Sequence, residues 1–591
     1  MYEYFEDSKD WLVLDVETTN LQRGDPWTEG NKLLLACWFF RGRYYYSSGS
    51  EFEQHNLLHH IEEATVIVAH NAKFELGWLY RCGYDLASKP VFCTMVGQYV
   101  VSGNRRLPLS LNAVAEHYGL GSKESLVDQL IKRGVCPSAL PETWLLEYCL
   151  QDVRLCLELA HRILAYCRNH QLVPVLFSRL SLTPVLTDIE RVGMCLDEGR
   201  VDDKYRAAIA ERGELRERMS EITGGINTNS NQQLTEYLFE VLRFKKPRDA
   251  NNKLMETASG ATSVSNAALD RLVPCNQRQR EFLGLRKRLN KLEGLVSKYL
   301  QKMQDCCQES GGILRASFNQ TITQTHRLSS SGKVYNIQLQ NVNRNLKPLF
   351  KARNEGWYVM EVDYSQLEFR VAVDLADDEQ GKKDILEGHD VHAHTASILF
   401  NEFKTATGSR KKALRTAAKA DTFKPLFGGQ SGTADQKRYY AEFKRRYKQI
   451  SDTQDTWCHD ALRTKELTLK PTGLKFFYPK AKLKEGGYIE ESTRIRNAPI
   501  QSFASAEITL GAVMLMWTWL KDTGLQSFIV ATIHDSIILE VHPDEVNTVS
   551  KFANRIMKEE VVEYIEKLYN HRIGVPLDIE VEYGQHWSEV V

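Results

Sequence analysis

The stretch VMEVDYSQLEFRVAV, residues 359–373, constrains the fold of this chain more than any other. Its alternation of apolar and polar residues predicts a strand that carries Glu361 and Asp363 on one face. A bend at YSQ follows, and residues 367–374 are expected to form a helix. A carboxylate at a strand end can bind a hard metal ion, whereas an aspartate there more often caps the following helix. The pattern alone leaves both roles open for Asp363.

Length and composition predict a soluble protein of several domains. The chain has 591 residues, too many for one hydrophobic core, and is 42% hydrophobic and 26% charged. Its 76 basic and 76 acidic residues cancel, which argues against unspecific coating of polyanions. A nucleic-acid enzyme of this composition must separate acidic pockets from basic surfaces.

The 12 cysteines include no CxxC pair, so reduced, idle thiols are favoured over a zinc site or a disulfide framework. The N-terminus is acidic and lacks an apolar signal segment, and no apolar run is expected to span a membrane. We therefore expect a cytoplasmic protein without membrane partners.

The string DYSQLEFR closely resembles the metal-binding palm motif of family A DNA polymerases. The resemblance implies a right-hand fold of thumb, palm and fingers, with Asp363 and Tyr364 as metal ligands. It also implies that Gln366 and Glu368 contact the incoming nucleotide and that Arg370 contacts DNA. Glu368 is expected to pack under the sugar and to exclude ribonucleotides by a clash with the 2′-hydroxyl.

The segment FIVATIHDSIILEV predicts two apolar strands joined by a tight turn, with Asp535 at the tip of the hairpin. It resembles the second metal motif of the same family, in which Asp535 and Asp363 would together hold two Mg²⁺ ions that Mn²⁺ could replace. His534 would lie at the primer end. Ser536 stands where many relatives have glutamate.

Two further segments, FNQTITQTHRLSSSGKVYNIQLQN and RIRNAPIQSFASAE, resemble parts of the family that lie along the primer–template. The residues implied in DNA contacts are Arg327, Gln340, Asn341, Asn497 and Gln501. His326 replaces the usual glycine, so the local backbone is expected to differ.

In RTAAKADTFKPLFGG, four residues recur every four positions: Arg415, Lys419, Phe423 and Phe427. On a helix they would form one continuous stripe. Two cations followed by two aromatic rings suit a triphosphate with a base stacked beyond it. Pro425 lies inside the pattern and is expected to deform the last turn.

This spacing resembles the nucleotide-binding helix of the family's fingers. The resemblance implies that Arg415 binds the γ-phosphate and that Lys419 binds near the α-phosphate and donates a proton to pyrophosphate. Phe423 would stack on the incoming nucleotide and reject dideoxynucleotides, and Phe427, in place of tyrosine, would lie near the templating base. His392, in GHDVHAHTA, would approach the triphosphate, a role that we favour over a zinc cluster there.

The N-terminal strand WLVLDVETTNL places Asp15 and Glu17 on one face, where two close carboxylates need a cation or a proton. Two later helices are predicted to carry polar pairs four residues apart, Asn71 with Glu75 and Tyr148 with Asp152. Each piece alone is weak evidence, because a single acidic residue on a helix is usually a solvated surface residue.

Together these pieces resemble the DEDDy 3′–5′ exonuclease set, which implies an RNase H-like domain. In that set two metal ions would be bound by Asp15, Glu17, Glu75 and Asp152. Tyr148 would orient the attacking water, and the two ions would stabilise the attacking and leaving oxygens. Glu75 stands where bacterial polymerases have aspartate, which is expected to affect the rate.

The region between these motifs predicts a long helix with an apolar stripe made of Leu285, Leu289, Leu292, Val296, Tyr299 and Met303. Its other faces carry Arg286, Lys287, Arg288, Lys291, Lys298 and Lys302. A solvated face and a phosphate-binding thumb both fit this pattern, and the position between the two sets of motifs favours the thumb.

The predicted fold class is therefore α/β multidomain, an RNase H-like exonuclease domain followed by a right-hand polymerase domain. We expect the exonuclease at residues 1–180, a linker and thumb at 181–312, the palm at 313–375 and 488–591, and the fingers at 376–487.

The expected function is a monomeric DNA-directed DNA polymerase with 3′–5′ proofreading, whose partners are primer–template DNA and deoxynucleoside triphosphates. Glu75, the segment KPLFGG and the expected lack of a 5′-nuclease domain favour a bacteriophage replicative enzyme in the host cytoplasm. Its replisome partners, such as a helicase–primase or a single-strand-binding protein, are not specified. The main alternative is a DNA-binding repair exonuclease with an impaired polymerase domain; a single-subunit RNA polymerase and an inactive scaffold fit less well.

Overall fold

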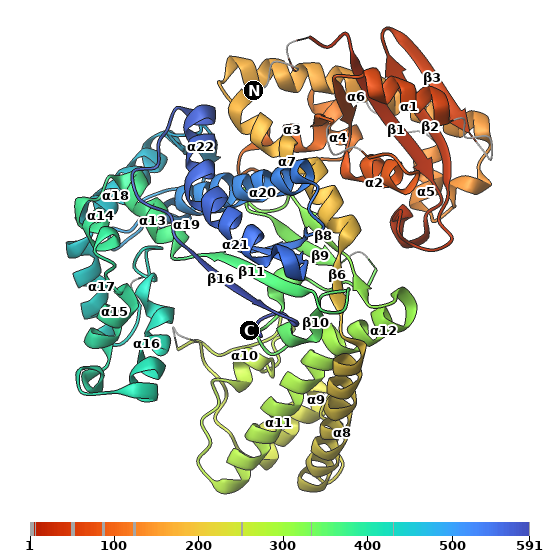
Figure 1. Ribbon diagram of the computed structural model, residues 1–591. Coiled ribbons are helices and arrows are strands. Elements are labelled where there is room, and N and C mark those ends of the chain that lie inside the picture. Colours follow the sequence, from red (N-terminus) through yellow and green to blue (C-terminus); the bar gives the residue numbers. More distant parts are fainter. Residues whose placement is uncertain are drawn as a thin grey trace.

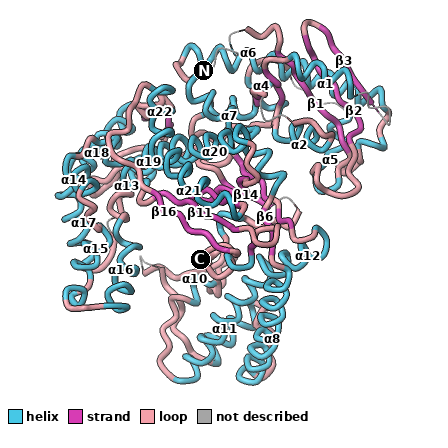
Figure 2. The backbone as a smooth tube through the Cα atoms, in the orientation of Figure 1, coloured by secondary structure: helices cyan, strands magenta, loops and turns pink. Residues whose placement is uncertain are grey.

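The computed structural model describes residue 5 and residues 7–48, 54–85, 89–121, 126–249, 252–332, 334–429 and 431–589. An N-terminal α/β domain lies beside a central sheet, which is flanked by two helical units (Figure 1). The strands gather in the N-terminal domain and in the centre of the molecule, and helices surround both (Figure 2). The predicted α/β multidomain class is thereby confirmed.

The N-terminal domain is built on a five-stranded sheet of order β3-β2-β1-β4-β5. Its central strand β1 (Trp11–Thr18) is antiparallel to β2 and parallel to β4. Residues 11–14 of β1 are apolar without alternation because both faces of the strand are buried there. The other elements used below are β2 (Leu33–Phe40), β3 (Arg43–Ser48), β4 (Val66–Ala69), β5 (Val91–Cys93), α2 (Lys73–Arg81), α3 (Thr94–Ser102), α5 (Leu126–Lys132) and α6 (Glu142–Asn169).

Helix α7 (Val173–Val192) joins this domain to the rest of the chain and runs through the expected boundary at residue 180. It packs on α2 and α3 on one side, and on α20 (Leu510–Thr523) and β14 (Phe528–Ile533) on the other. Most of its residues are buried, so the N-terminal domain and the palm share a core along this helix.

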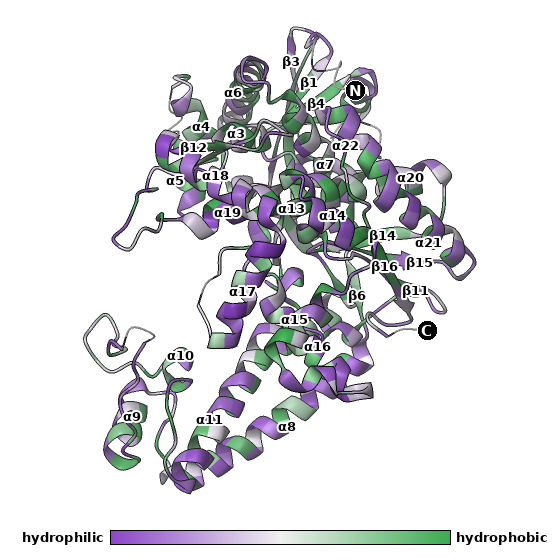
Figure 3. Cartoon of the chain, turned by 90° about the vertical axis from the view of Figure 1, so that its left-hand side faces the viewer, coloured by the Kyte–Doolittle hydropathy of each residue, from purple (hydrophilic) through white to green (hydrophobic). Residues whose placement is uncertain are grey.

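The thumb is built from two long helices, α8 (Glu198–Thr223) and α11 (Gln277–Leu295), which project from the body (Figures 1 and 3). The helix of α11 continues through a π-helical turn, η6 (Val296–Leu300), into α12 (Gln301–Ser310). The predicted apolar stripe is confirmed, with Leu289, Leu292, Val296 and Met303 buried. Arg286 departs from the predicted basic face, because its side chain is buried and donates to Thr228 Oγ1 at 3.3 Å.

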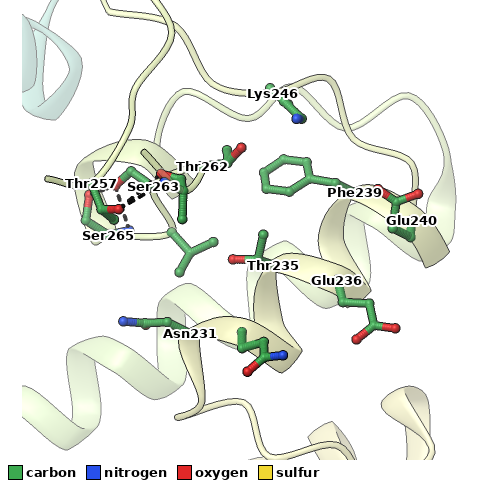
Figure 4. Close-up of a pocket in the computed structure, with 13 residues that line it drawn as sticks. Asn231, Thr235, Glu236, Phe239, Glu240, Lys246, Thr257, Thr262, Ser263 and Ser265 are labelled. Atoms are coloured by element: carbon green, nitrogen blue, oxygen red, sulfur yellow. Dashed lines mark hydrogen bonds between the residues drawn. The ribbon is translucent and has the colours of Figure 1, made fainter. Parts of the chain in front are cut away.

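The thumb tip holds a pocket of about 600 Å³ between the helical segment α9–η5 (Asn231–Glu236 and Tyr237–Val241) and the loop that reaches Ser265. Phe239 points from η5 toward the part of the loop that carries Thr262 (Figure 4). None of the residues that line this pocket belongs to the central sheet or to the predicted catalytic set, so the catalytic residues lie elsewhere.

The palm is a four-stranded antiparallel sheet of order β14-β15-β11-β16. The predicted hairpin is present, with β14 leading through the turn at 534–535 into β15. The palm elements used below include β11 (Tyr358–Tyr364), β15 (Ser536–Val541), β16 (Ile579–Gly584), α13 (Leu367–Ala376), α19 (Ser492–Gln501), the π-helical η10 (Ser502–Thr509), α21 (Val546–Arg555) and α22 (Val561–Tyr569).

The fingers are mainly helical, with α14 (Glu379–Leu386), α15 (Val391–Leu399), α16 (Gly408–Thr422), α17 (Ala434–Arg446) and α18 (Lys448–Thr464), and they also hold a two-stranded sheet of β12 (Glu466–Thr468) and β13 (Lys475–Phe477). Helix α16 ends at Thr422, with Phe423 as its C-terminal cap. The predicted stripe therefore continues only as far as the helix end, and Phe427 lies in the turns beyond it. Pro425, which cannot donate to a helical carbonyl, accounts for this early end.

The sequence was expected to contain no apolar run long enough to span a membrane. Judged by length and composition alone, this expectation was wrong. The continuous helix Ser492–Thr523 is long and apolar enough, but 78% of its most apolar window is buried inside the protein. Such burial is typical of the core helix of a globular domain, and hydropathy alone does not separate the two cases.

Candidate active sites

The palm carboxylates Asp363 and Asp535 meet although they are far apart in the sequence. Asp363 lies opposite Ser536 in the β11–β15 ladder, and the amide of Tyr364 donates to the carbonyl of Asp535 at 3.3 Å. The turn that carries Asp535 is tight because His534 has a φ of 55°. The strand pairing therefore brings the two predicted metal-binding carboxylates together at one end of the two central strands of the sheet.

The electrostatics of this end of the sheet fit a cation. Burial first, and then the carboxylates of Glu361, Asp535 and Glu580, raise the pKa of Asp363 to about 7. Burial also raises the pKa of Asp535, although Ser505 Oγ donates to it at 3.4 Å. Crowded carboxylates that resist ionisation are stabilised by a divalent ion, so the donor set fits a hard metal.

Sequence reasoning missed Glu580, which lies opposite Asp363 on the other side of β11. The only signal was the alternation in IEVEYG, which predicts a strand but not its neighbour. Ser536 has a structural role, because its hydroxyl donates to the carbonyl of Ile533 at 2.8 Å and closes the hairpin.

Residues after β11 lie around the same end of the sheet. Burial and the charge of Asp535 raise the pKa of Glu368. A hydrogen bond from Gln501 acts in the opposite direction and lowers that pKa. Gln366 precedes α13 in a left-handed conformation, with a φ of 56°. The phenol of Tyr364 is buried and donates to the carbonyl of Met557 at 2.8 Å, so only its backbone could face a metal.

Arg370 is engaged within the palm. Its guanidinium donates to the carbonyls of Ser365, at 2.9 Å, and Pro576, and lies 4.0 Å from Asp578. Its predicted DNA contact would compete with these hydrogen bonds.

Of the residues predicted to contact DNA, Arg327 and His534 lie close enough to Asp535 to lower its pKa, and Gln501 hydrogen-bonds to Glu368. Arg327 hydrogen-bonds with His534 Nδ1 at 3.0 Å, and Gln501 accepts from Thr325 Oγ1 at 3.0 Å. Gln340 donates to the carbonyl of Leu328 at 3.3 Å.

Two amides of the predicted DNA-binding set differ in their surroundings. The carbonyl of Asn341 accepts from Tyr299 of the thumb at 3.0 Å, which ties the thumb to the palm. The side-chain oxygen of Asn497 is buried without a hydrogen-bond partner among the described residues. An unpartnered amide oxygen leaves an acceptor available to a bound molecule.

The fingers bring cations and aromatic rings together as predicted for the helix itself. Arg415 donates to Asp390 Oδ2 at 2.6 Å, and the exposed Lys419 lies one turn further along α16. His392 is buried, bonded to Thr422 Oγ1 at 3.0 Å, and its pKa is lowered to about 4 by burial and by the charges of Arg415 and Lys419.

Phe423 lies against His392 and against the helix of the palm motif. Its ring is 5.4 Å from that of His392 and stacks at 5.7 Å on Phe369 of α13. The predicted nucleotide-stacking ring therefore stands where the fingers meet the palm.

The N-terminal domain gathers the predicted exonuclease residues. Asp15 and Glu17 come from β1, Glu75 from α2, and Tyr148 and Asp152 from α6. Burial first, and then the charges of Asp15, Glu17 and Asp152, raise the pKa of Glu75 well above its usual range. The four carboxylates are thus close enough to interact, as their predicted role requires.

Glu75 gives the clearest indication that the donor set of this cluster fits a cation. Its side chain is 3% exposed, and Oε2 has no hydrogen-bond partner among the described residues. A buried carboxylate oxygen without a donor is costly unless it is protonated or bound by a metal, so the donor set fits a divalent ion. Asn71 differs from the prediction, because α2 begins only at Lys73 and Asn71 precedes it with a φ of 62°.

Two residues near this cluster, Asp128 and Cys149, were not predicted. Asp128 of α5 accepts a hydrogen bond from the phenol of Tyr148 at 2.9 Å. Burial and the charges of Asp152 and Glu17 raise the pKa of that phenol. Cys149 places its sulfur so that ligand atoms of Asp15, Glu17 and Cys149 all lie within 4.8 Å of one another. The signal in the sequence was the position of Cys149 next to Tyr148 in YCLQD. A search for CxxC pairs does not detect such a single cysteine.

Comparison with known proteins follows the same division. Residues 201–589 match the sequence model of DNA polymerase family A, and residues 5–166 match that of a 3′-5′ exonuclease. DNA polymerase I of Chloroflexus aurantiacus is 27% identical over 546 residues, 88% of this chain and 54% of that protein. The thermostable DNA polymerase I of Thermus aquaticus is 28% identical over 418 residues, 69% of this chain and 47% of that protein. The chain thus spans about half the length of these curated relatives.

A solved structure shares the fold over nearly the whole chain. The POL domain of Pol1 from M. smegmatis, in complex with DNA primer-template and dNTP, superposes with a TM-score of 0.76 at 20% identity. The match covers 98% of this chain and 95% of that one. At this identity the likeness establishes the architecture alone.

Proposed function

The chain belongs to DNA polymerase family A, and on that premise we propose that it adds deoxynucleotides to a primer 3′-hydroxyl under the direction of a DNA template. The observation that carries the proposal is the meeting of Asp363 and Asp535 at one end of the two central strands of the palm sheet, beside Glu368. We propose further that the N-terminal domain removes nucleotides from the 3′ end as a proofreading exonuclease.

Asp363 and Asp535 would hold the divalent ions of the polymerase site, Mg²⁺ with Mn²⁺ as a substitute. When bound, such ions lower the pKa of the primer hydroxyl and neutralise the triphosphate. Arg327 and His534 lie beside these carboxylates and would fix the primer end. Glu368 would exclude the 2′-hydroxyl of a ribonucleotide.

The fingers would bind the triphosphate. Arg415 would exchange its hydrogen bond with Asp390 for a phosphate oxygen, and Lys419 would donate a proton to the leaving pyrophosphate. Phe423 would stack on the base that Arg415 and Lys419 deliver. His392 stays neutral at physiological pH because of its lowered pKa, so it would contact the triphosphate as a neutral hydrogen-bonding group.

The thumb would hold the duplex by its phosphates. A groove of about 920 Å³ runs along α11 and is lined by basic residues, namely Lys204, Lys287, Arg288, Lys291 and Lys298. Lys287 and Arg288 are paired with Asp270 and Glu211, so phosphate binding there would replace exposed ion pairs of small energy.

In the exonuclease domain, Asp15, Glu17, Glu75 and Asp152 would hold two divalent ions. Tyr148 would turn from Asp128 to orient the attacking water. The longer side chain of Glu75 keeps the charge of the usual aspartate.

We propose a replicative role in a bacteriophage and a place in the host cytoplasm, as a monomer. The support is the pair of departures at Glu75 and at Phe427 with Pro425. One observation favours the alternative of a repair exonuclease with an impaired polymerase domain. Helix α16 ends at Thr422, so Phe427 does not continue the stripe of Arg415, Lys419 and Phe423.

Primer extension and primer digestion on paired variants separate these functions. Asp535→Ala should lower extension by about 100-fold or more and keep digestion, and Asp15→Ala should do the opposite. Asp435→Ala, which removes an exposed aspartate of α17, is the matched control and should change neither. Wild-type protein that digests a primer but cannot extend it with all four deoxynucleotides would leave the repair exonuclease as the function.

A further inference from the structure

The thiol of Cys149 lies within the carboxylate cluster of the proposed exonuclease site. Cys149 follows Tyr148 on α6, and its sulfur lies within 4.8 Å of carboxylate oxygens of Asp15 and Glu17, which also lie within that distance of each other. The thiol is 3.4 Å from the carbonyl of Asp15, to which it donates. Two carboxylates and a sulfur at this spacing form a mixed donor set that could close around one ion.

An independent observation points to a ligand at the same place. Glu75 is buried at 3% exposure, and its Oε2 has no hydrogen-bond partner among the described residues. The charges of Asp15 and Glu17 act on this carboxylate, so it faces the cluster that includes the thiol. The cluster therefore has an unused buried acceptor in addition to its three close ligand atoms.

Sulfur and carboxylate ligands select different metals. Mg²⁺ prefers six oxygen ligands in near-octahedral geometry, whereas Zn²⁺ and similar thiophilic ions bind thiolate sulfur and carboxylate oxygen in tetrahedral sites. Oxygen ligands alone would favour the hard ion. A thiol beside Asp15 and Glu17 adds a ligand that only a thiophilic ion uses.

We propose that Cys149, Asp15 and Glu17 form a site for a thiophilic divalent cation of the Zn²⁺ and Cd²⁺ type, which displaces the hard ion and arrests 3′–5′ digestion. On binding, the S–H bond of Cys149 breaks, a sulfur–metal bond forms, and the proton passes to the buffer. The metal keeps its charge, and no oxidant or reductant takes part. The arrest rests on the proposed exonuclease function, whereas the binding of the ion does not.

Binding is tested directly with Cd²⁺ alone, added to the full-length metal-free protein. A cadmium–thiolate bond gives an ultraviolet charge-transfer band, and calorimetry gives the affinity. Cys149→Ser should remove the band and weaken binding at least about tenfold, as is usual when a supporting group of a metal site is lost. Asp15→Asn should also weaken binding, because the carboxylate shares the ion.

Two cysteines serve as matched controls. Cys275 is the exposed thiol of the thumb, and Cys167 is a buried thiol on the same helix as Cys149. Cys275→Ser and Cys167→Ser should both keep the band and the affinity of the wild type. A band that disappears in Cys275→Ser and persists in Cys149→Ser would overturn the proposal.

The functional readout compares each variant with its own rate in Mg²⁺. Cd²⁺ added to Mg²⁺ should slow digestion of a single-stranded oligonucleotide in the wild type several-fold more than in Cys149→Ser. Should Cys149→Ser fail to fold, Cys149→Ala and the band of the wild-type protein still decide the question. A wild type that binds Cd²⁺ through Cys149 but digests nothing in Mg²⁺ refutes the proposed exonuclease, whereas digestion in Mg²⁺ without Cys149-dependent binding refutes the metal site.

Discussion

Arg179 of α7 and Glu507 of the palm helix form a buried ion pair between the N-terminal domain's last helix and the polymerase core. The guanidinium donates to both carboxylate oxygens, one at 3.1 Å, and also to the carbonyl of Ala506 at 3.0 Å. Tyr569 donates to the same carboxylate at 2.5 Å. The side chains are 3% and 0% exposed, so each charge depends on the other for its solvation.

Removing one member of this pair should destabilise the contact strongly. Arg179→Met leaves Glu507 buried without its partner, which costs about 3–5 kcal/mol and should lower the thermal unfolding temperature. The double variant Arg179→Met with Glu507→Leu should recover much of the loss, because an apolar pair of similar volume fills the site. Calorimetry of thermal unfolding measures the loss of stability in each variant. Equal losses in the single and the double variant would contradict an ion-pair origin.

Glu368 should set the choice between deoxyribose and ribose. Its carboxyl interacts with the charge of Asp535 and is hydrogen-bonded to Gln501. Glu368→Ala should raise ribonucleotide incorporation at least about tenfold, equal to 1.4 kcal/mol, by removing the clash. Single-nucleotide extension measures the ratio of ribonucleotide to deoxynucleotide use, and an unaltered ratio would refute this role.

Local patterns predicted the strands and turns that carry the acidic residues, because alternation and turn chemistry are properties of neighbouring residues. The hairpin at Asp535 is such a case. Glu580 escaped because its position beside Asp363 depends on which strand pairs with β11, and pairing joins residues that are far apart in sequence.

Helical spacing was similarly reliable only where the helix continues. Arg415 and Lys419 lie on α16 as expected, but Phe427 does not, because the helix ends before Pro425. The sequence predicts Arg286 on a basic outer face, but its side chain is buried and donates to Thr228. The sequence shows a charge, whereas burial depends on what packs over it.

Phe423 should govern discrimination against dideoxynucleotides. Its ring contacts those of His392 and Phe369 and has no hydroxyl to replace the missing 3′-hydroxyl of a dideoxynucleotide. Phe423→Tyr should therefore increase dideoxynucleotide use at least about tenfold, since one hydrogen bond to a charged group contributes about 1.5–3 kcal/mol. Termination ladders on a primed template measure the change. Phe403→Tyr, in the separate small core of the fingers, is the control and should leave the ladder as in the wild type.

His326 should make the contact between the exonuclease domain and the palm sensitive to acid. Its backbone is left-handed, with a φ of 60°, and its buried ring bonds to the carbonyl of Gly103 at 3.2 Å. Burial and the charge of Arg179 lower its pKa to about 3. The unfolded chain protonates this histidine near pH 6.5, so between the two values the unfolded state binds more protons and the folded state loses stability as the pH falls.

His326→Asn tests this sign, because asparagine tolerates the left-handed backbone and does not titrate. From about pH 7 to about pH 4.5 the wild type should lose up to about 1.4 kcal/mol per pH unit more than the variant. Denaturant unfolding at both pH values measures the difference, with the exposed His459→Asn as control. A gap between wild type and His326→Asn that stays constant with pH would show that the buried ring contributes packing alone.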